Sequence, residues 1–460
     1  MRCLLSWLLP LSACAGCDAS PDPATCTTTA VDAASVSASV DDAYPTFATV
    51  ALTAGEPVEV RLYASAEGAP DVPGPTRGVE GDVTLPLRGL RPETAYTIHV
   101  VDETAGGCEV ATTSLTTGAI EGDPSGFDVL EDDGTHEGFL AIATLTSGTG
   151  VAGVTVVDAG GAAVWHWQNP EGVGGVLHFS EPTPDGDAFR VLFDDPGYPE
   201  NARVVTVDWT GETSERSIDG IHHSLTQKVP GVAYAAFVHV SREVPGFGAR
   251  CGANDDWVVG DAIVEVGADG TVTEVWNAFD HWSIECHEGM YPVTGGTDWT
   301  HLNALDYDPD DDAWLVSSYW YGELVKIDRA TGEDLWRLGT GPDADCVEQI
   351  ERAHGSEFTD LGVAVYDNGH SGGARMVELE VDWATGACSV AGEIFGEAEA
   401  TTLGDVDVTG GRWFTAWGDL GELKVAEDEA VLWHAKVTDE FAEEHGGFVV
   451  ASVDWLPVLE

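Results

Sequence analysis

The chain has 460 residues, of which 19 are Lys or Arg and 80 are Asp or Glu, so its formal net charge at pH 7 is −61. This balance argues against a nucleic-acid partner, because phosphate binding needs a basic surface. Acidic runs such as residues 308–312 are expected to be solvated turns, and the alternative for them is a structural Ca²⁺ ion held by carboxylates. No other cofactor or metal is predicted.

The first 17 residues predict a lipoprotein-type signal peptide. A single Arg precedes an apolar run that is too short to span a bilayer, and small residues then precede a cysteine. Both Cys14 and Cys17 fit lipidation, and lipidation at Cys17 would leave an even number of cysteines in the mature chain. We therefore expect an exported protein anchored by lipid to the cell envelope, in the periplasm or on the outer surface, with no other membrane contact.

Residues 21–118 are predicted to form a separate β-sandwich. Their short apolar runs have the spacing of sandwich strands, and LRGLRPETAYTIHV resembles the tyrosine-corner region of fibronectin type III domains, with Tyr96 as the tyrosine. Cys26 and Cys108 lie near the two ends of this unit, so a disulfide between them is expected in an oxidising compartment. The unit shows no chemistry of its own and is interpreted as a spacer or docking domain that packs loosely beside the next one. Residues 119–137 are acidic and Gly-rich and are interpreted as a linker.

Residues 138–460 contain six imperfect copies of one apolar strand, 46 to 61 residues apart. The copies begin at Val154, Val204, Ile263, Leu324, Met376 and Glu422. The clearest copy lies within residues 298–339, where four short apolar runs separated by turn signals predict a four-stranded antiparallel sheet. Six such repeats predict a six-bladed β-propeller, and the alternative is a sandwich array or solenoid. Residues 446–457 are left over after the sixth repeat and are expected to complete the first blade.

The remaining cysteines are expected to pair as Cys251 with Cys286 and Cys346 with Cys388, although their spacing does not fix this connectivity.

Histidines recur at equivalent places in four consecutive repeats. The first strand of each propeller blade lines the central channel, so residues at the same first-strand position converge on one axis. By the repeat alignment these residues are His178, one of the pair His222 and His223, His301 and His354. Packing alone would favour Val or Leu there, so we predict that these imidazoles share one small pocket.

At these residues the sequence resembles the bacterial arylsulfate sulfotransferase family. The resemblance covers about residues 138–457, and it is carried by the H-x-N of His301 and Asn303, the strand LVSS, the KIDRxTG turn, and a His paired with a later DNG at residues 367–369. It implies an exported six-bladed propeller that moves a sulfuryl group from a phenolic sulfate ester to a phenol without a nucleotide sulfate donor.

The resemblance also implies residue roles. His354 would be the nucleophile that forms a sulfohistidine, and His301, Asn303 and one of His222 and His223 would hold the sulfate oxygens. Sulfuryl transfer places charge on equatorial oxygens, so protonated imidazoles, including His301 and His178, would donate to the anion and act as acid or base for the phenols.

One position departs from the family pattern. Where the family usually has an arginine after LVSS, this chain has Tyr319. Arg352 is the candidate replacement, because it lies two residues before His354 and would therefore share its strand face. Two hypotheses of other classes stay open: a noncatalytic surface lipoprotein whose propeller binds a ligand or partner, and a metal-dependent propeller lyase or hydrolase that uses the histidines as ligands.

Overall fold

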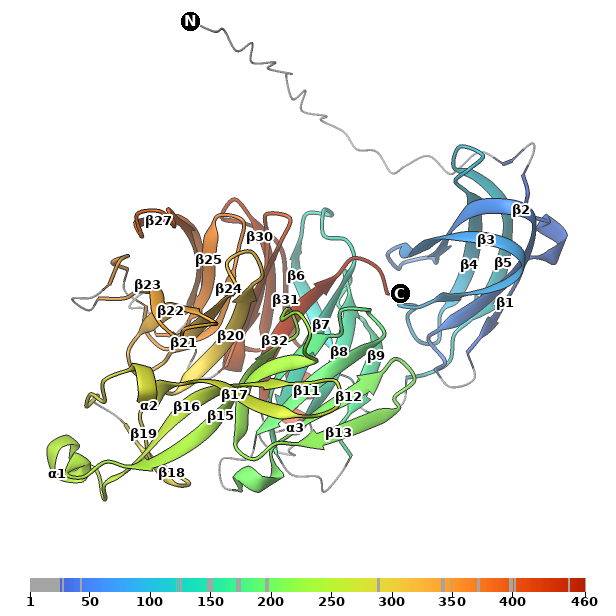
Figure 1. Cartoon of the computed structure of the whole chain (residues 1–460). Coiled ribbons are helices and arrows are strands. Elements are labelled where there is room, and N and C mark those ends of the chain that lie inside the picture. The colour runs from blue at the N-terminus through green and yellow to red at the C-terminus, as the bar shows by residue number, and fades with distance from the viewer. Residues whose placement is uncertain are drawn as a thin grey trace, which may run out of the picture.

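The structure is a computed structural model. It describes residues 25–459, apart from residues 27–28, 42–43, 121, 123, 125, 147–151, 171–174, 195–197, 288–289, 341–343, 349, 370–372, 397–399, 401–402 and 446. The predicted signal peptide and both candidate lipidation sites, Cys14 and Cys17, lie outside the described residues. The all-β class is confirmed, because strands dominate the chain and the helices are short (Figure 1). Within the described ranges, no helix is long and apolar enough to cross a membrane.

The N-terminal unit is a single five-stranded sheet organised around one long strand. Its elements are η1 (Ala33–Ser35), β1 (Ser37–Val40), β2 (Ala48–Ser65), β3 (Val72–Leu87), β4 (Ala95–Asp102) and β5 (Cys108–Thr116). β2 pairs with β1 and β3 and, through its last six residues, with β4, so all five strands belong to one sheet. The hydroxyl of buried Tyr96 accepts a hydrogen bond from the backbone N–H of Arg91 at 2.9 Å, as in a tyrosine corner.

The described residues from Phe127 onward form six sheets, which we call blades 1 to 6. Blade 1 contains β7 (Phe139–Thr146), β8 (Ala152–Asp158), β9 (Ala163–Gln168) and β32 (Phe448–Leu456). Blade 2 contains β10 (Val176–Pro182), β11 (Ala188–Asp194), β12 (Arg203–Asp208) and β13 (Thr213–Ser217). Blade 3 contains β14 (Ile221–Thr226), β15 (Tyr234–Glu243), β16 (Trp257–Val266), β17 (Val272–Asn277), β18 (Pro292–Val293) and β19 (Gly296–Asp298).

Blade 4 contains β20 (Leu302–Asp308), β21 (Ala313–Ser318), β22 (Glu323–Asp328) and β23 (Asp334–Leu338). Blade 5 contains β24 (Ala353–Phe358), β25 (Gly362–Asp367), β26 (Arg375–Val381) and β27 (Cys388–Phe395). Blade 6 contains β28 (Asp405–Thr409), β29 (Arg412–Trp417), β30 (Glu422–Glu427), β31 (Ala430–Val437) and β6 (Phe127–Asp132).

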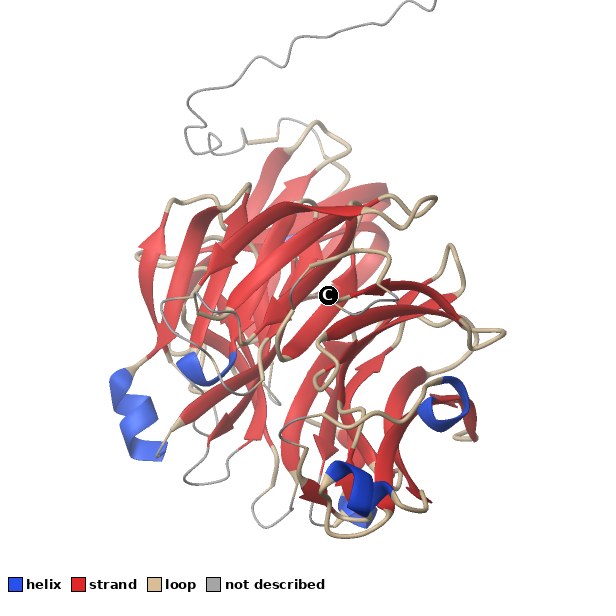
Figure 2. Ribbon diagram, turned by 90° about the vertical axis from the view of Figure 1, so that its left-hand side faces the viewer, coloured by secondary structure: helices blue, strands red, loops and turns tan. Residues whose placement is uncertain are grey.

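Short helices occur in the connections: η2 (Pro199–Asn201), α1 (Phe247–Cys251), α2 (Ala278–His281), η3 (Gly418–Leu420) and α3 (Asp439–His445). Figure 2 shows the longer ones at the periphery of the strands.

The six aligned repeats correspond to the sheets. Each apolar strand used for the alignment is the third strand of its own blade: β8, β12, β16, β22, β26 and β30. The innermost strands contact one another in a closed ring, in the order β32, β10, β14, β20, β24, β28 and back to β32. A closed ring of sheets leaves no open end, so this arrangement differs from the solenoid that the sequence left as an alternative.

Two strands from opposite ends of the chain close the ring. β32 pairs antiparallel with β7, which confirms that the C-terminal strand completes the first blade. β6 pairs antiparallel with β31 at the outer edge of blade 6, so part of the predicted linker is a strand of the last blade. The linker prediction was wrong there because FDVLED is a mostly exposed edge strand whose acidic composition resembles that of a loop.

The N-terminal unit packs against blade 1 more tightly than predicted. One continuous apolar cluster includes Phe47 of the N-terminal unit together with Phe139, Trp165 and Trp209 of the blades. Arg91 makes a bidentate ion pair with the carboxylate of Asp158, with N–O distances of 2.5 and 3.0 Å. Shared apolar burial and a forked ion pair hold the two units together, so the expectation of loose packing was wrong.

All three expected disulfides are present, joining Cys26 to Cys108, Cys251 to Cys286 and Cys346 to Cys388. The Cys251–Cys286 disulfide joins two insertions of blade 3. The Cys346–Cys388 disulfide joins the connection between blades 4 and 5 to β27.

Candidate active site

A bulge interrupts the innermost strand of four consecutive blades where the predicted site residues lie. The register shifts between Leu177 and Phe179 in β10, between His222 and Leu225 in β14, between Leu302 and Ala304 in β20, and between Ala353 and Ser356 in β24. A bulge leaves one residue outside the ladder and re-aims its side chain. The bulges therefore turn His178, His223, Asn303 and His354 toward the channel.

Two of the histidines have strained backbones. His223 has a φ of 54° and His301 a φ of 44°, a left-handed conformation that is rare for residues other than glycine. Such strain persists only where the surrounding structure enforces it, and it concentrates at functional sites.

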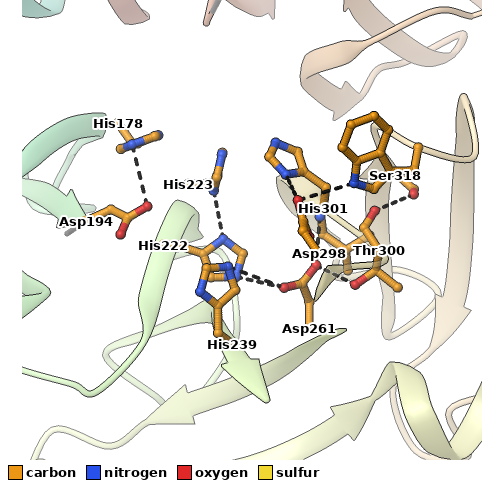
Figure 3. A network of polar contacts seen from close by, with 12 residues as sticks. His178, Asp194, His222, His223, His239, Asp261, Asp298, Thr300, His301 and Ser318 are labelled. Atoms are coloured by element: carbon orange, nitrogen blue, oxygen red, sulfur yellow. Dashed lines mark hydrogen bonds and ion pairs between the residues drawn. The ribbon is translucent and has the colours of Figure 1, made fainter. Parts of the chain in front are cut away.

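The imidazoles form a chain across the end of the channel (Figure 3). Ring centroids are 4.6 Å apart for His178 and His223 and 4.9 Å apart for His223 and His301. The ring of Tyr319 lies 5.0 Å from His301 and 6.2 Å from His354. A cavity of about 130 Å³ is lined by His178, His223, Asn303 and His354 among others. The structure thus brings His178, His223 and His354 to one cavity and places His301 beside His223, outside the residues that line the cavity.

Asn368 orients the imidazole of His354. Nδ1 of His354 lies 2.6 Å from Oδ1 of Asn368, whose Nδ2 donates to the backbone carbonyl of Leu403 at 2.8 Å. The carbonyl of Leu403 fixes which end of the amide faces His354, so Nδ1 of His354 carries the proton and Nε2 carries the lone pair. Burial lowers the pKa of His354 to about 4, so the ring is neutral near pH 7.

Asp298 favours the protonated form of His301, whereas His354 is neutral. Nδ1 of His301 lies 2.5 Å from Oδ2 of Asp298, a carboxylate that also accepts from the indole N–H of Trp320 at 3.2 Å. Burial lowers the pKa of His301, but the charge of Asp298 and its hydrogen bond outweigh burial, and the pKa is raised above its ordinary value of 6.5. The site therefore holds one imidazole poised as a cation and one poised as a neutral base.

The two members of the pair His222 and His223 have different environments. His223 lines the cavity, whereas His222 is 1% exposed and lies behind it, with its Nδ1 2.8 Å from Nδ1 of His223. On the other side, Nε2 of His222 lies 3.1 Å from Oδ1 of buried Asp261, and the ring stacks on His239 at 3.9 Å. His223 is therefore the member of the pair placed to contact a ligand in the cavity.

The remaining predicted site residues differ in position. Asn303 donates through Nδ2 to the carbonyl of Ala353 at 2.8 Å and lines the cavity. Tyr319 lies between the rings of His301 and His354. Arg352 is exposed and precedes β24 in a bend with a φ of 62°, so the argument that it shares a strand face with His354 was wrong.

Carboxylates surround the rest of the cavity and link neighbouring blades. Backbone N–H groups of a neighbouring blade donate to four of the six carboxylates that line the cavity: Gln227 to Glu181, Phe358 to Asp306, Val408 to Glu357, and Trp455 to Asp407. Lys228 pairs with Asp306 at 2.8 Å. Burial raises the pKa of Glu181 to about 7 and that of Asp405 to about 8. These groups satisfy strand edges in the channel, and several are protonated near pH 7, so we interpret them as structural.

Four site residues were not found from the sequence: Asp194, His239, Asp261 and Asp298. The three aspartates could not be singled out from the sequence, because the chain has 80 acidic residues. His239 does not occupy the position at which the repeats carry a histidine. A weak signal existed for Asp298, which precedes His301 by three residues in DWTH. Two groups of these side chains have ligand atoms within 4.8 Å of one another and could hold a metal ion: His178, Asp194 and His223, and His222, His239 and Asp261.

Comparisons with known proteins support the resemblance seen in the sequence. Residues 129–345 match the model of the family described as Arylsulfotransferase (ASST). The matched segment contains His178, His223, His301 and Tyr319 and ends nine residues before His354. No curated protein matches the chain.

Three of the solved structures that match illustrate the similarity. The periplasmic gluconolactonase PpgL of Pseudomonas aeruginosa has 13% identity and a TM-score of 0.40, and the match covers 70% of this chain and 100% of that one. An auxiliary nutrient binding protein of Bacteroides ovatus has 10% identity and a TM-score of 0.36, with 86% and 82% covered. The β-propeller domain of Cps50 (Swd1) of Myceliophteria thermophila has 10% identity and a TM-score of 0.37, with 67% and 89% covered. All three TM-scores lie below 0.5, so no function is inferred from these structures.

Proposed function

The chain is an arylsulfotransferase-family protein, and on that premise we propose that it moves a sulfuryl group from a phenolic sulfate ester to a phenol through a sulfated His354. One observation carries the proposal. The hydrogen bond from His354 to Asn368 holds the ring in the tautomer whose Nε2 lone pair is free to attack sulfur, and burial keeps that ring neutral.

The first half-reaction breaks the bond between sulfur and the phenolic oxygen of the donor. Nε2 of His354 attacks sulfur and forms an N–S bond, and the electron pair of the broken bond leaves with the phenolic oxygen. His301, protonated beside Asp298, gives that oxygen its proton. The products are a free phenol and sulfohistidine, and His301 is left neutral.

The second half-reaction reverses these roles. Neutral His301 takes the proton of the acceptor phenol, whose oxygen attacks sulfur and displaces Nε2 of His354. The product is a new phenolic sulfate, and both imidazoles return to their initial states. Splitting one displacement into two easier ones is the advantage that covalent catalysis brings.

His223 and Asn303 are assigned to the sulfate oxygens. Both line the cavity beside His354, and Nε2 of His223 and the second N–H of Asn303 Nδ2, whose first N–H donates to Ala353, can donate to an anion. Charge on the equatorial oxygens grows in the transition state, so fixed donors stabilise it more than the ground state. His301 supplies the positive charge that an arginine at position 319 would supply in the family pattern.

Export is part of the proposal. Three disulfides fit an oxidising compartment such as the periplasm or the cell surface. A lipid anchor at Cys14 or Cys17 would hold the protein at the envelope.

Turnover of nitrophenyl sulfate in the presence and absence of an added phenol tests the proposal. Nitrophenol release should depend on the added phenol and should be lost in His354→Ala. The matched control is His281→Ala, which removes an exposed histidine of α2 and should leave the rate unchanged. Release by His354→Ala at the wild-type rate would contradict the proposal.

A further inference from the structure

Three paired strands of blade 3 bring together a side-chain cluster behind the cavity. In the register of the sheet, His239 of β15 stands opposite Asp261 of β16, and His222 of β14 stands opposite Phe237, two residues before His239. Because side chains two apart on a strand point to the same face, His222, His239 and Asp261 share one face. We call these three residues the rear cluster (Figure 3).

The polar atoms of the rear cluster converge on one point. Oδ1 of Asp261 lies 3.1 Å from Nε2 of His222 and 3.9 Å from Nε2 of His239. Two ligands of a tetrahedral Zn²⁺ ion with bonds of about 2.0–2.1 Å are about 3.3 Å apart. The observed separations of 3.1 and 3.9 Å lie near this value, and all three ligand atoms are within 4.8 Å of one another.

Two of these atoms are deeply buried without a hydrogen bond. Nε2 of His222 and Oδ1 of Asp261 have no hydrogen-bond partner among the described residues, although the two side chains are 1% and 0% exposed. The two atoms are 3.1 Å apart, but the geometry between them is not that of a hydrogen bond. Each atom has the other as its ion-pair partner, and neither makes a well-aligned hydrogen bond, so both are available as ligands of a shared metal ion.

The second oxygen of Asp261 is held by the protein. Oδ2 accepts from the hydroxyl of Thr300 at 2.7 Å and from the backbone N–H of Leu302 at 2.8 Å. Hydrogen bonds of this kind orient a ligating carboxylate and leave its other oxygen for the metal.

We propose that the rear cluster binds one divalent transition-metal ion of the Zn²⁺ type through Nε2 of His222, Nε2 of His239 and Oδ1 of Asp261. Two imidazoles and a carboxylate suit Zn²⁺ and its neighbours, whereas Ca²⁺ and Mg²⁺ prefer oxygen ligands alone. The rings of His222 and His239 now stack at 3.9 Å with an angle of 23°, so one must turn to share an ion. His239 is the one free to do so, since its side chain is 23% exposed.

The ion would set the tautomer of His223. With Nε2 of His222 on the metal, the proton of His222 is on Nδ1 and is donated to Nδ1 of His223, 2.8 Å away. The proton of His223 is then on Nε2, the nitrogen available to a ligand in the cavity. This consequence rests on the proposed function, in which His223 donates to a sulfate oxygen, whereas the metal site itself does not.

Metal binding by the full chain tests the site without any activity measurement. The protein is treated with a chelator, exchanged into metal-free buffer, and titrated with Zn²⁺ or Co²⁺. We expect about one ion per chain by elemental analysis, ligand-field bands for Co²⁺, and a rise in Tm with Zn²⁺ because the ion binds only the folded state. His239→Ala removes a partly exposed ligand and should weaken binding by more than about 100-fold, since even outer hydrogen-bond partners of metal ligands contribute 10- to 100-fold.

His178→Ala is the control, because it disrupts the other group of metal-ligating side chains and spares the rear cluster. It should keep the bound ion. Failure of wild-type protein to bind Zn²⁺ or Co²⁺, or binding that survives His239→Ala, would overturn the assignment. His239→Ala must also keep the Tm of metal-free wild type, which shows that it is folded. Sulfuryl transfer by a protein that binds neither Zn²⁺ nor Co²⁺ would leave the proposed function standing while removing this site.

Discussion

The Nδ1 atom of His354, in β24, lies 2.6 Å from Oδ1 of Asn368, which directly follows the neighbouring strand β25 and is 14 positions away in the sequence. This hydrogen bond decides which nitrogen of the proposed nucleophile can attack.

Asn368→Ala should therefore lower the rate of sulfuryl transfer by about 100-fold, because the imidazole can then rotate or change tautomer and small misplacements of a reacting group cost this much. Steady-state kinetics with nitrophenyl sulfate measure the effect on kcat. A circular dichroism spectrum like that of wild type would show that the fold is intact. An unchanged kcat would mean that Asn368 does not position the nucleophile.

The pairing of His301 with Asp298 predicts a particular pH dependence. Activity needs His354 neutral and His301 protonated in the free enzyme, so kcat/KM should fall at low pH near the His354 pKa of about 4, and at high pH above the ordinary histidine value of 6.5. Asp298→Asn keeps an oxygen acceptor but removes the charge that raises the pKa of His301. The alkaline limb should then move to lower pH while the acidic limb stays in place.

Asp280→Asn, at an exposed position in α2, is the control and should leave both limbs where they are. An alkaline limb that does not move in Asp298→Asn would show that His301 is not the group responsible for it.

Tyr319 occupies the position where the family pattern has an arginine. Its ring lies between His301 and His354, so Tyr319→Arg would place a guanidinium beside the His301 imidazolium, and like charges repel. We expect the rate of transfer to stay the same or fall. Arg352→Ala should leave the rate close to that of wild type, because Arg352 is exposed and is not among the residues that line the cavity. If Tyr319→Arg instead creates activity in an inactive wild type, the natural protein is a binding propeller.

Buried carboxylates in the channel predict a stability change with pH. The pKa of Asp405 is about 8 in the folded protein and 3.8 for an ordinary aspartate, so the folded state holds this proton more tightly. The resulting stability is fully present below about pH 4 and is lost as pH rises through 8. Asp405→Asn stays neutral and should raise Tm at pH 8 by roughly 2–4 °C, with little change at pH 4.

Asp310→Asn, in an exposed turn, should leave Tm close to wild type at both pH values. A Tm gain from Asp405→Asn that is equal at pH 4 and pH 8 would contradict the assignment of this carboxyl as neutral.

The sequence predicted more of the fold than of the site. Periodic strands such as those at Val154 and Leu324 identify blades because each must bury the same apolar face, and the repeated histidines followed from that alignment. β6 was missed because an exposed edge strand carries no apolar alternation.

Residues that act through others were harder to find. Asp261 and His239 meet His222 only through the register of blade 3, which single-sequence patterns do not fix. Arg352 was a wrong candidate because the prediction assumed that it and His354 lie on one strand. Its left-handed backbone conformation places it in a bend before that strand begins.

The central claim is that His354 carries the sulfuryl group, and mass spectrometry of the trapped enzyme tests it most directly. Brief incubation with nitrophenyl sulfate in the absence of an acceptor phenol, followed by acid-free digestion, should show a gain of about 80 mass units, one SO₃ group, on the peptide that contains His354. Addition of a phenol should remove the adduct, and His354→Ala should never form it. An adduct on another residue, or turnover with no adduct on His354, would contradict the mechanism.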